Sequence, residues 1–182
     1  ISGNNLQTLN IQNNTISLKG HTGSSRVTGI KVGNASCGAT SITIDGNTIE
    51  DCTFTAGSTG EFYGIDIGFN ATAVAITNNI IQNNVINTTT TSVQYLIYNN
   101  TTGSAIDVSY NQMLNNYKTV SSTAGILYGY YSASGSATGT QVFHDNIIDG
   151  LGIPSAQNGS VCAVRISSSI NQSKEIYNNA VS

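Results

Sequence analysis

Three ionisable side chains in this sequence could do acid–base chemistry. Asp107, His144 and Glu175 are far apart along the chain but recur at similar intervals. Carboxylates and imidazoles are the side chains that most often transfer protons in enzymes. Charged side chains are also common on solvated outer surfaces, where they have no catalytic role. The three residues are therefore candidates for a catalytic site only if the fold brings them together.

A second candidate site is aromatic. Tyr95, Tyr128, Tyr130 and Tyr131 lie in or near predicted strands of a sequence that is otherwise rich in Asn and Ser. Tyrosine rings beside a polar surface can stack on sugar rings or contact a partner protein. Buried tyrosines instead fill a core, so both interpretations stay open.

The cysteine and histidine content argues against a metal site. Cys37, Cys52 and Cys162 have no metal-ligand spacing, and the chain has only two histidines. We therefore expect no metal and no cofactor. Cys37 and Cys52 could instead form a disulfide that closes a short loop, which would add about 3 kcal/mol of stability.

The elements that position these residues follow a repeated phrase, apolar-x-apolar-x-x-Asn-x-apolar. The copy at Leu9–Ile16 is followed by five others, of which the last two are imperfect at the first apolar position. The aligned asparagines are Asn14, Asn47, Asn79, Asn111, Asn146 and Asn179. They recur with a near-constant period of about 33 residues, and a period of this length indicates a solenoid.

A second apolar phrase follows each of the first five asparagines, about half a period later. Its copies are Gly29–Val32, Gly64–Ile67, Tyr95–Tyr98, Gly125–Tyr128 and Ala163–Ile166. Alternation places the third residue of each copy outward. The expected outward column is Lys31, Asp66, Ile97, Leu127 and Arg165.

Together the phrases predict an all-β fold, a right-handed parallel β-helix with about 33 residues per coil and about five to six coils. One unit cannot bury its own apolar face, whereas units stacked at the β-strand spacing of about 4.8 Å share a core. Asn tolerates the left-handed torsions of a sharp turn, and its amide can bond the Asn of the next coil. We therefore expect an internal asparagine ladder, with Asp107, His144 and Glu175 facing outward on adjacent coils.

The segments ITNNIIQNNVI and ISGNNLQTLNIQNNTI resemble the right-handed parallel β-helix proteins of the pectate-lyase-like superfold. They are similar in particular to the Asn-rich repeat regions of large secreted bacterial surface proteins. The resemblance covers nearly the whole chain and implies the fold. It leaves the function open, because this scaffold carries lyases, hydrolases, epimerases, tailspikes and adhesins. The Asp pair, Gly-His-Gly segment and Arg-x-Lys of its polygalacturonase-like enzymes are missing from this sequence.

The composition argues against several classes of protein. Only 8% of the 182 residues are charged, and the net charge is −3. Six dispersed basic residues cannot form the basic surface that nucleic-acid binding requires. No apolar stretch approaches the roughly 18 residues of a membrane span, and the N-terminus does not resemble a signal peptide. The resemblance implies an extracellular or cell-surface location, so an export signal would lie upstream.

We expect residues 1–182 to be a single β-helix segment of a longer chain. Ile1 and Ser182 both fall inside a predicted coil, and neither end carries the polar capping unit that a solenoid needs. The alternative is a subunit whose open ends stack on neighbouring copies.

Two functional hypotheses remain. The first is a non-catalytic structural or adhesive β-solenoid of a cell-surface protein or filament. The second is a carbohydrate-active enzyme, either a polysaccharide lyase or a glycoside hydrolase, or a polysaccharide-binding module. The expected partners are polysaccharides or other surface proteins.

Overall fold

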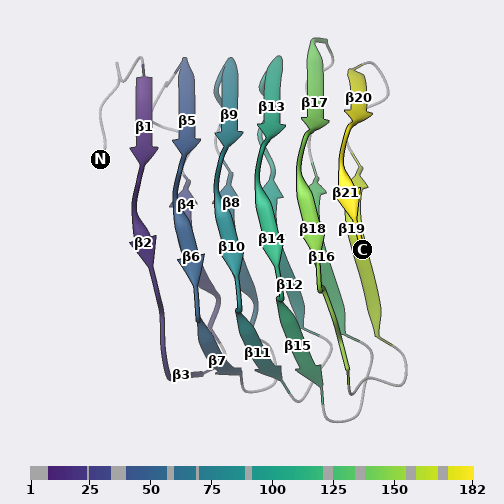
Figure 1. The fold of residues 1–182 in the computed structure, drawn as a ribbon. Helices are drawn as coiled ribbons and strands as arrows, with labels where there is room; N and C mark the ends of the chain where they lie inside the picture. Colours follow the sequence, from purple (N-terminus) through teal and green to yellow (C-terminus); the bar gives the residue numbers. More distant parts are fainter. Residues whose placement is uncertain are drawn as a thin grey trace.

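The computed structural model describes residues 8–23, 25–33, 40–56, 60–68, 70–88, 92–120, 125–133, 138–154, 159–167 and 172–182. The chain winds repeatedly around one axis and forms a parallel β-solenoid (Figure 1). The described ranges contain strands and no helix. Accordingly, no helix in them has the length and apolar character needed to cross a membrane.

Four parallel sheets run along the solenoid, and each collects the equivalent strands of successive windings. The first sheet contains β1 (Thr8–Gln12), β5 (Ser41–Asp45), β9 (Ala73–Thr77), β13 (Ala105–Ser109), β17 (Thr140–His144) and β20 (Ser173–Tyr177). The second contains β2 (Thr15–Ile16), β6 (Thr48–Glu50), β10 (Ile80–Gln82), β14 (Gln112–Leu114), β18 (Ile147–Asp149) and β21 (Ala180–Val181). The third contains β3 (His21–Gly23), β7 (Thr53–Ala56), β11 (Val85–Thr88) and β15 (Tyr117–Val120). The fourth contains β4 (Val27–Val32), β8 (Phe62–Ile67), β12 (Val93–Asn99), β16 (Ile126–Ser132) and β19 (Ser160–Ile166).

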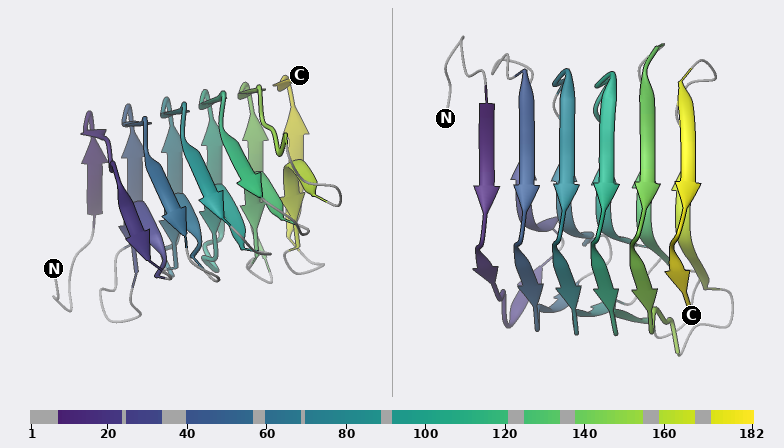
Figure 2. Two further views of the ribbon diagram at one scale, coloured as in Figure 1. Left: turned by 90° about the horizontal axis from the view of Figure 1, so that it is seen from below. Right: turned by 45° about the horizontal axis from the view of Figure 1, so that its top comes forward.

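Equivalent strands pair one repeat apart. Leu9 pairs with Ile42, its counterpart in the next copy of the first phrase, in the expected register. Four successive windings contain a strand of every sheet; in the described residues the fifth has three strands and the last has β20 and β21. Figure 2 shows the windings side by side along the axis. The structure confirms the predicted all-β parallel solenoid and its repeat length.

The core consists of apolar columns that run from winding to winding. Ile44, Ile76 and Val108 pair in register in the first sheet, and none has exposed surface. Complete burial of such a side chain contributes about 1.5–3 kcal/mol. Phe143 continues the column, whereas Ile176 in the last winding is 55% exposed. Each winding therefore gains its buried surface by stacking on its neighbours.

The six repeat asparagines form a continuous hydrogen-bonded ladder between the first and second sheets. Each Nδ2 donates to the Oδ1 of the next asparagine at 2.9–3.0 Å. Each backbone N–H donates to that same Oδ1 at 3.0–3.1 Å. The Nδ2 group also reaches a carbonyl of the preceding winding, as from Asn79 to Ile44 at 2.9 Å. The predicted ladder is confirmed.

The left-handed turn residue precedes each ladder asparagine. Asn13, Asn78, Tyr110 and Asp145 have φ angles of 53–56°, while the ladder asparagines have no positive φ. The prediction that the ladder residue itself adopts these torsions is therefore wrong. The ladder side chain has to point into the solenoid, and the residue before it makes the turn.

Tyr110 is the strained member of this set of turn residues. A bulky residue in the left-handed region costs about 1–2 kcal/mol, and Asn tolerates that region better. We expect Tyr110→Asn to raise the free energy of unfolding by about 1 kcal/mol, measured by urea denaturation. As a control, Asn83→Ala removes a tolerant residue at φ 54° and should lower the free energy of unfolding. A Tyr110→Asn protein no more stable than the parent would contradict the strain argument.

A second corner, between the second and third sheets, carries a shorter ladder that the sequence analysis did not predict. Asn84 Nδ2 donates to Asn116 Oδ1 at 2.8 Å, and both side chains are buried. Cys52 takes the equivalent position one winding earlier, where its backbone N–H donates to Asn84 Oδ1 at 3.0 Å. Its Sγ accepts from the Leu18 N–H at 3.4 Å. Cys52 thus lies buried at a turn, where its thiol and backbone make these contacts. Cys37, its predicted disulfide partner, lies outside the described residues, so the disulfide stays a prediction.

Candidate functional site

The outer face of the fourth sheet differs from the predicted column. Strand pairing makes Lys31, Asp66, Tyr98, Tyr131 and Arg165 equivalent. Ile97 and Leu127, which were predicted to face outward, are fully buried in the core. Their predicted positions are wrong because the predicted alignment set Ile97 and Leu127 level with Asp66. Strand pairing instead sets Tyr98 level with Asp66, one residue after Ile97, and Tyr131 level with Tyr98, four residues after Leu127.

Tyr130, one of the four tyrosines predicted at a binding face, lies inside the solenoid. Its side chain has no exposed surface, and its ring stacks on Phe143 with centroids 4.9 Å apart. Its hydroxyl accepts hydrogen bonds from the side-chain amides of Asn99 and Gln141. Tyr130 is therefore out of reach of a surface ligand.

Five tyrosines gather on the outer face of the fourth sheet, and we call them the tyrosine strip. They are Tyr63 on β8, Tyr95 and Tyr98 on β12, and Tyr128 and Tyr131 on β16. The Tyr95 ring contacts the other four rings, with centroid separations of 4.8–5.5 Å. Such pairs contribute about 0.5–1.5 kcal/mol each beyond the burial of their surface. Three of the predicted tyrosines, Tyr95, Tyr128 and Tyr131, lie in this strip.

An arginine stands at each end of the tyrosine strip. The Arg26 guanidinium lies 4.1 Å from the Tyr63 ring centroid and pairs with Glu61 at 2.9 Å and Asp66 at 3.6 Å. Arg165 donates from Nη1 to the Tyr128 hydroxyl at 2.8 Å and lies 5.4 Å from the Tyr131 ring centroid. Both arginines are therefore placed for cation–π contacts, and the Arg26 charge is also balanced by carboxylates.

Tyr63, Tyr95 and Tyr98 of the strip are neutral phenols at physiological pH. Burial raises the pKa of Tyr63 and of Tyr98, and it raises the pKa of Tyr95 to about 12. Nearby Glu61 acts in the same direction on Tyr63 and Tyr95, because a negative charge disfavours a phenolate. The strip therefore presents uncharged rings with polar hydroxyls, a surface suited to sugar rings or to a protein partner.

On the first sheet, the structure brings Asp107 and His144 together. Asp107 Oδ1 lies 3.3 Å from His144 Nε2, and Asp145 Oδ2 lies 2.7 Å from His144 Nδ1. The Tyr177 ring stacks on the imidazole at a centroid distance of 4.9 Å, and Tyr110 meets it edge-on at 5.6 Å. Asp145, Tyr110 and Tyr177 were not predicted as site residues.

Glu175, the third candidate acid–base residue, does not join this cluster. Its backbone pairs in register with Val142, and its carboxylate makes no hydrogen bond or ion pair within the described ranges. Ser109 pairs in register with His144 but is buried and makes no side-chain hydrogen bond to it. A general base needs a free nitrogen facing the proton it removes, and both His144 nitrogens already face carboxylates.

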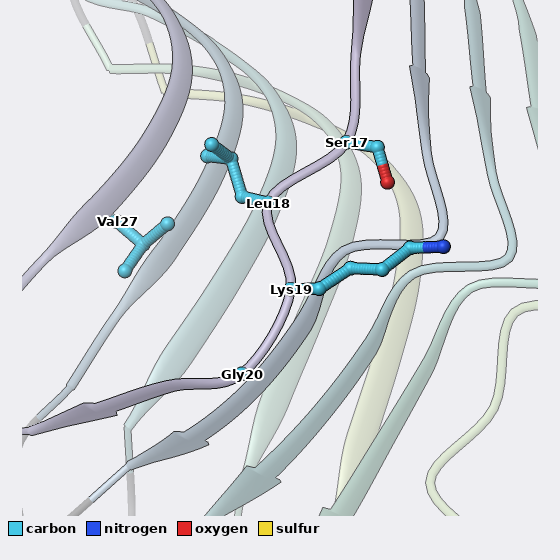
Figure 3. A pocket seen from close by; sticks show the side chains of 5 residues that line it. All are labelled: Ser17, Leu18, Lys19, Gly20 and Val27. Atoms are coloured by element: carbon cyan, nitrogen blue, oxygen red, sulfur yellow. The ribbon is translucent and has the colours of Figure 1, made fainter.

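The described surface has depressions on the first sheet and at the first winding. One, of about 260 Å³, lies on the outer face of the first sheet and is lined by Ala73, Ala75, Ala105, Asp107, Thr140 and Val142. The other, of about 450 Å³, lies at the first winding, where Leu18 points toward Val27 while Lys19 points away (Figure 3). Only the first depression adjoins a candidate site residue.

No protein-family model, curated protein or solved structure matches this chain.

The described residues include no group of three His, Cys, Asp or Glu side chains that could hold a metal ion. The two surfaces with functional potential are thus the tyrosine strip and the Asp107–His144 pair. The tyrosine strip can bind a ligand through the aromatic rings and hydroxyl groups of its tyrosines. The pair, together with Asp145, places the His144 imidazole between two carboxylates.

Proposed function

We propose that this chain is a non-catalytic structural or adhesive segment of an extracellular surface protein or filament. The observation that supports this most is the unbroken asparagine ladder, which links every winding to the next by side-chain and backbone hydrogen bonds. A solenoid built this way distributes load over repeated interfaces. The resemblance of the Asn-rich repeats to pectate-lyase-like β-helices of secreted bacterial surface proteins supports the same proposal.

The proposed structural role can be tested by pulling the chain from its two ends in a force spectrometer. We expect single windings to detach stepwise, each lengthening the chain by about 110 Å. The ladder variant Asn79→Ala should lower the force of the steps. Gradual extension without steps would contradict a load-bearing role.

The second candidate function is a carbohydrate-active enzyme or polysaccharide-binding module. It is favoured by the 3.3 Å approach of Asp107 and His144 beside an apolar depression. Because both His144 nitrogens face carboxylates, those of Asp107 and Asp145, we expect no turnover of acidic polysaccharides, measured as new reducing ends or unsaturated products. Turnover that Asp107→Asn abolishes, while the fold is kept, would replace the structural proposal with the enzymatic one.

A further inference from the structure

We propose that the tyrosine strip is a site of oxidative modification, at which Tyr63 and Tyr95 become joined by a carbon–carbon bond between their rings. The bond would staple β8 to β12, and thus one winding to the next. It needs a one-electron oxidant of the peroxidase class with hydrogen peroxide. This inference does not depend on the function proposed above.

The geometry favours this pair. Tyr63 and Tyr95 are paired in register on neighbouring strands, so their backbones hold them side by side. Their ring centroids are 4.8 Å apart and their planes are inclined by 34°, the closest ring pair of the strip. The centroids of two directly bonded rings are separated by two ring radii and one carbon–carbon bond, slightly less than this distance. At the observed separation the two unbonded rings overlap face to face, so coupling requires the side chains to turn until an ortho carbon of one ring meets an ortho carbon of the other.

The surroundings also favour oxidation at Tyr63. Removing an electron from a neutral phenol requires that its proton leave at the same time. The Tyr63 hydroxyl donates to Glu61 Oε2 at 3.2 Å, which gives that proton an acceptor. The Arg26 guanidinium also lies 4.1 Å from the Tyr63 ring centroid, but Glu61 and Asp66 balance its charge. The Tyr128 hydroxyl instead accepts from Arg165, which has no carboxylate partner among the described residues, and this positive charge disfavours loss of an electron there.

The partly exposed members of the strip give the oxidant access. Tyr95, Tyr98 and Tyr131 are half-buried, whereas Tyr63 is 3% exposed. A radical formed at Tyr95 can pass to Tyr63 by hydrogen-atom exchange across their contact. A second oxidation at Tyr95 then places two radicals on adjacent rings.

The reaction balances as follows. Each tyrosine loses its hydroxyl hydrogen as one proton and one electron, and the two phenoxyl radicals form one bond between ring carbons ortho to the oxygens. The hydrogens on those carbons then move to the oxygens and restore both phenols. The two electrons and two protons reduce one hydrogen peroxide to two water molecules.

Exposure alone predicts a different outcome. Tyr110, Tyr177 and Tyr117 are the most exposed tyrosines, at 55%, 44% and 36%, and none of them contacts another tyrosine ring among the described residues. If exposure decided which tyrosines are oxidised, these three residues would form bonds to tyrosines of other molecules. Oxidation governed by proximity couples the strip within one molecule.

The test treats the whole chain, at low concentration, with a haem peroxidase and hydrogen peroxide. The monomer is then isolated and mapped by peptide mass spectrometry. We expect a monomer lighter by two hydrogens, dityrosine fluorescence, and a linked peptide pair that contains Tyr63 and Tyr95. Tyr95→Phe keeps the ring and should lower the monomer dityrosine yield by about tenfold or more, and Tyr63→Phe should do the same. Tyr110→Phe, the matched control, should leave it unchanged.

The inference is overturned if the links map to Tyr110, Tyr117 or Tyr177, or if only dimers form. It is equally overturned if folded Tyr95→Phe and Tyr63→Phe proteins, checked by circular dichroism, give the parental yield. A link confined to Tyr98 and Tyr131 would refute the assignment to Tyr63 and Tyr95.

Discussion

Replacing Asn79 by alanine is expected to lower the free energy of unfolding by about 2–4 kcal/mol. Asn79 is fully buried, and its Oδ1 accepts both the backbone N–H and the Nδ2 of Asn47 at 3.0 Å. Alanine leaves the buried backbone N–H of Asn47 without an acceptor, whereas the Asn47 Nδ2 group keeps the carbonyls of Ile11 and Asp45 as acceptors. Each unsatisfied buried donor costs about 1–3 kcal/mol, and the carbonyl of Ile44 and the Oδ1 of Asn111 also lose a partner.

The matched control for this change is Asn14→Ala at the first rung of the ladder. The Asn14 side chain is exposed and donates to Asn47 without accepting from another described residue. We expect its loss to cost about 1 kcal/mol or less. Urea denaturation of both variants measures the difference. Equal destabilisation at the two positions would show that burial of the ladder adds nothing to its stability.

The second large effect concerns Lys118, which occupies an inward position of β15. It pairs in register with Ile86 in the core, has no exposed surface, and donates from Nζ to Ser92 Oγ at 3.1 Å. Burial lowers the pKa of Lys118 to about 8, although the negative charge of Glu61 acts in the opposite direction. A charged lysine therefore destabilises this core.

The sign of the pH dependence follows from this lowered pKa. Between pH 8 and the ordinary lysine value of 10.5, the folded chain holds fewer protons than the unfolded chain at Lys118. The free energy of unfolding therefore increases as the pH rises through this window, and the deprotonation of Lys118 contributes about 3 kcal/mol to the increase. Below pH 8 the full penalty remains. Lys118→Met removes the penalty, and we expect it to stabilise the protein by up to about 3 kcal/mol at pH 7.

Other groups titrate in the same window, so the parent and the variant have to be compared at each pH. Burial raises the pKa of Cys52, Tyr63 and Tyr95, and this makes the free energy of unfolding fall as the pH rises through the unfolded pKa values of these groups. These contributions cancel in the difference between the two proteins. That difference should shrink from pH 8 upward. Lys19→Met, at a lysine with a 66% exposed side chain, is the control and should give no comparable stabilisation at pH 7. A constant advantage of Lys118→Met at every pH would refute the buried charge.

The first phrase of the repeat was a sufficient guide to much of the fold. It predicted the parallel solenoid, the pairing of the first sheet and the six ladder positions. It did so because each ladder Asn and its flanking apolar residues interact with the same residues one winding away. The second corner had a similar signal, the Asn pairs that end at Asn84 and Asn116, each at the same short distance after a ladder Asn. The repeated phrase was aligned on one Asn per unit, so it did not include the second Asn that forms this corner.

The candidate sites were only partly predictable. The sequence placed Asp107 and His144 on the same outer face, but it did not distinguish them from Glu175, because contact depends on side-chain direction across neighbouring strands. It assigned Tyr130 to a surface although that residue is in the core. The prediction aligned Gly125 with Gly29 in the second phrase. This alignment was wrong because the segments that connect the strands vary in length.

The amino-acid sequence by itself determined that this chain winds with a near-constant period and stacks its asparagines, because a repeated pattern of residue types specifies its own neighbours. Only the tertiary structure decided which tyrosines share one face and that Lys118 lies in the core. It also decided that the carboxylate of Asp145 faces the second ring nitrogen of His144. Those contacts depend on the register of strands joined by segments of unequal length, and a shift of one residue moves a side chain from the surface to the core.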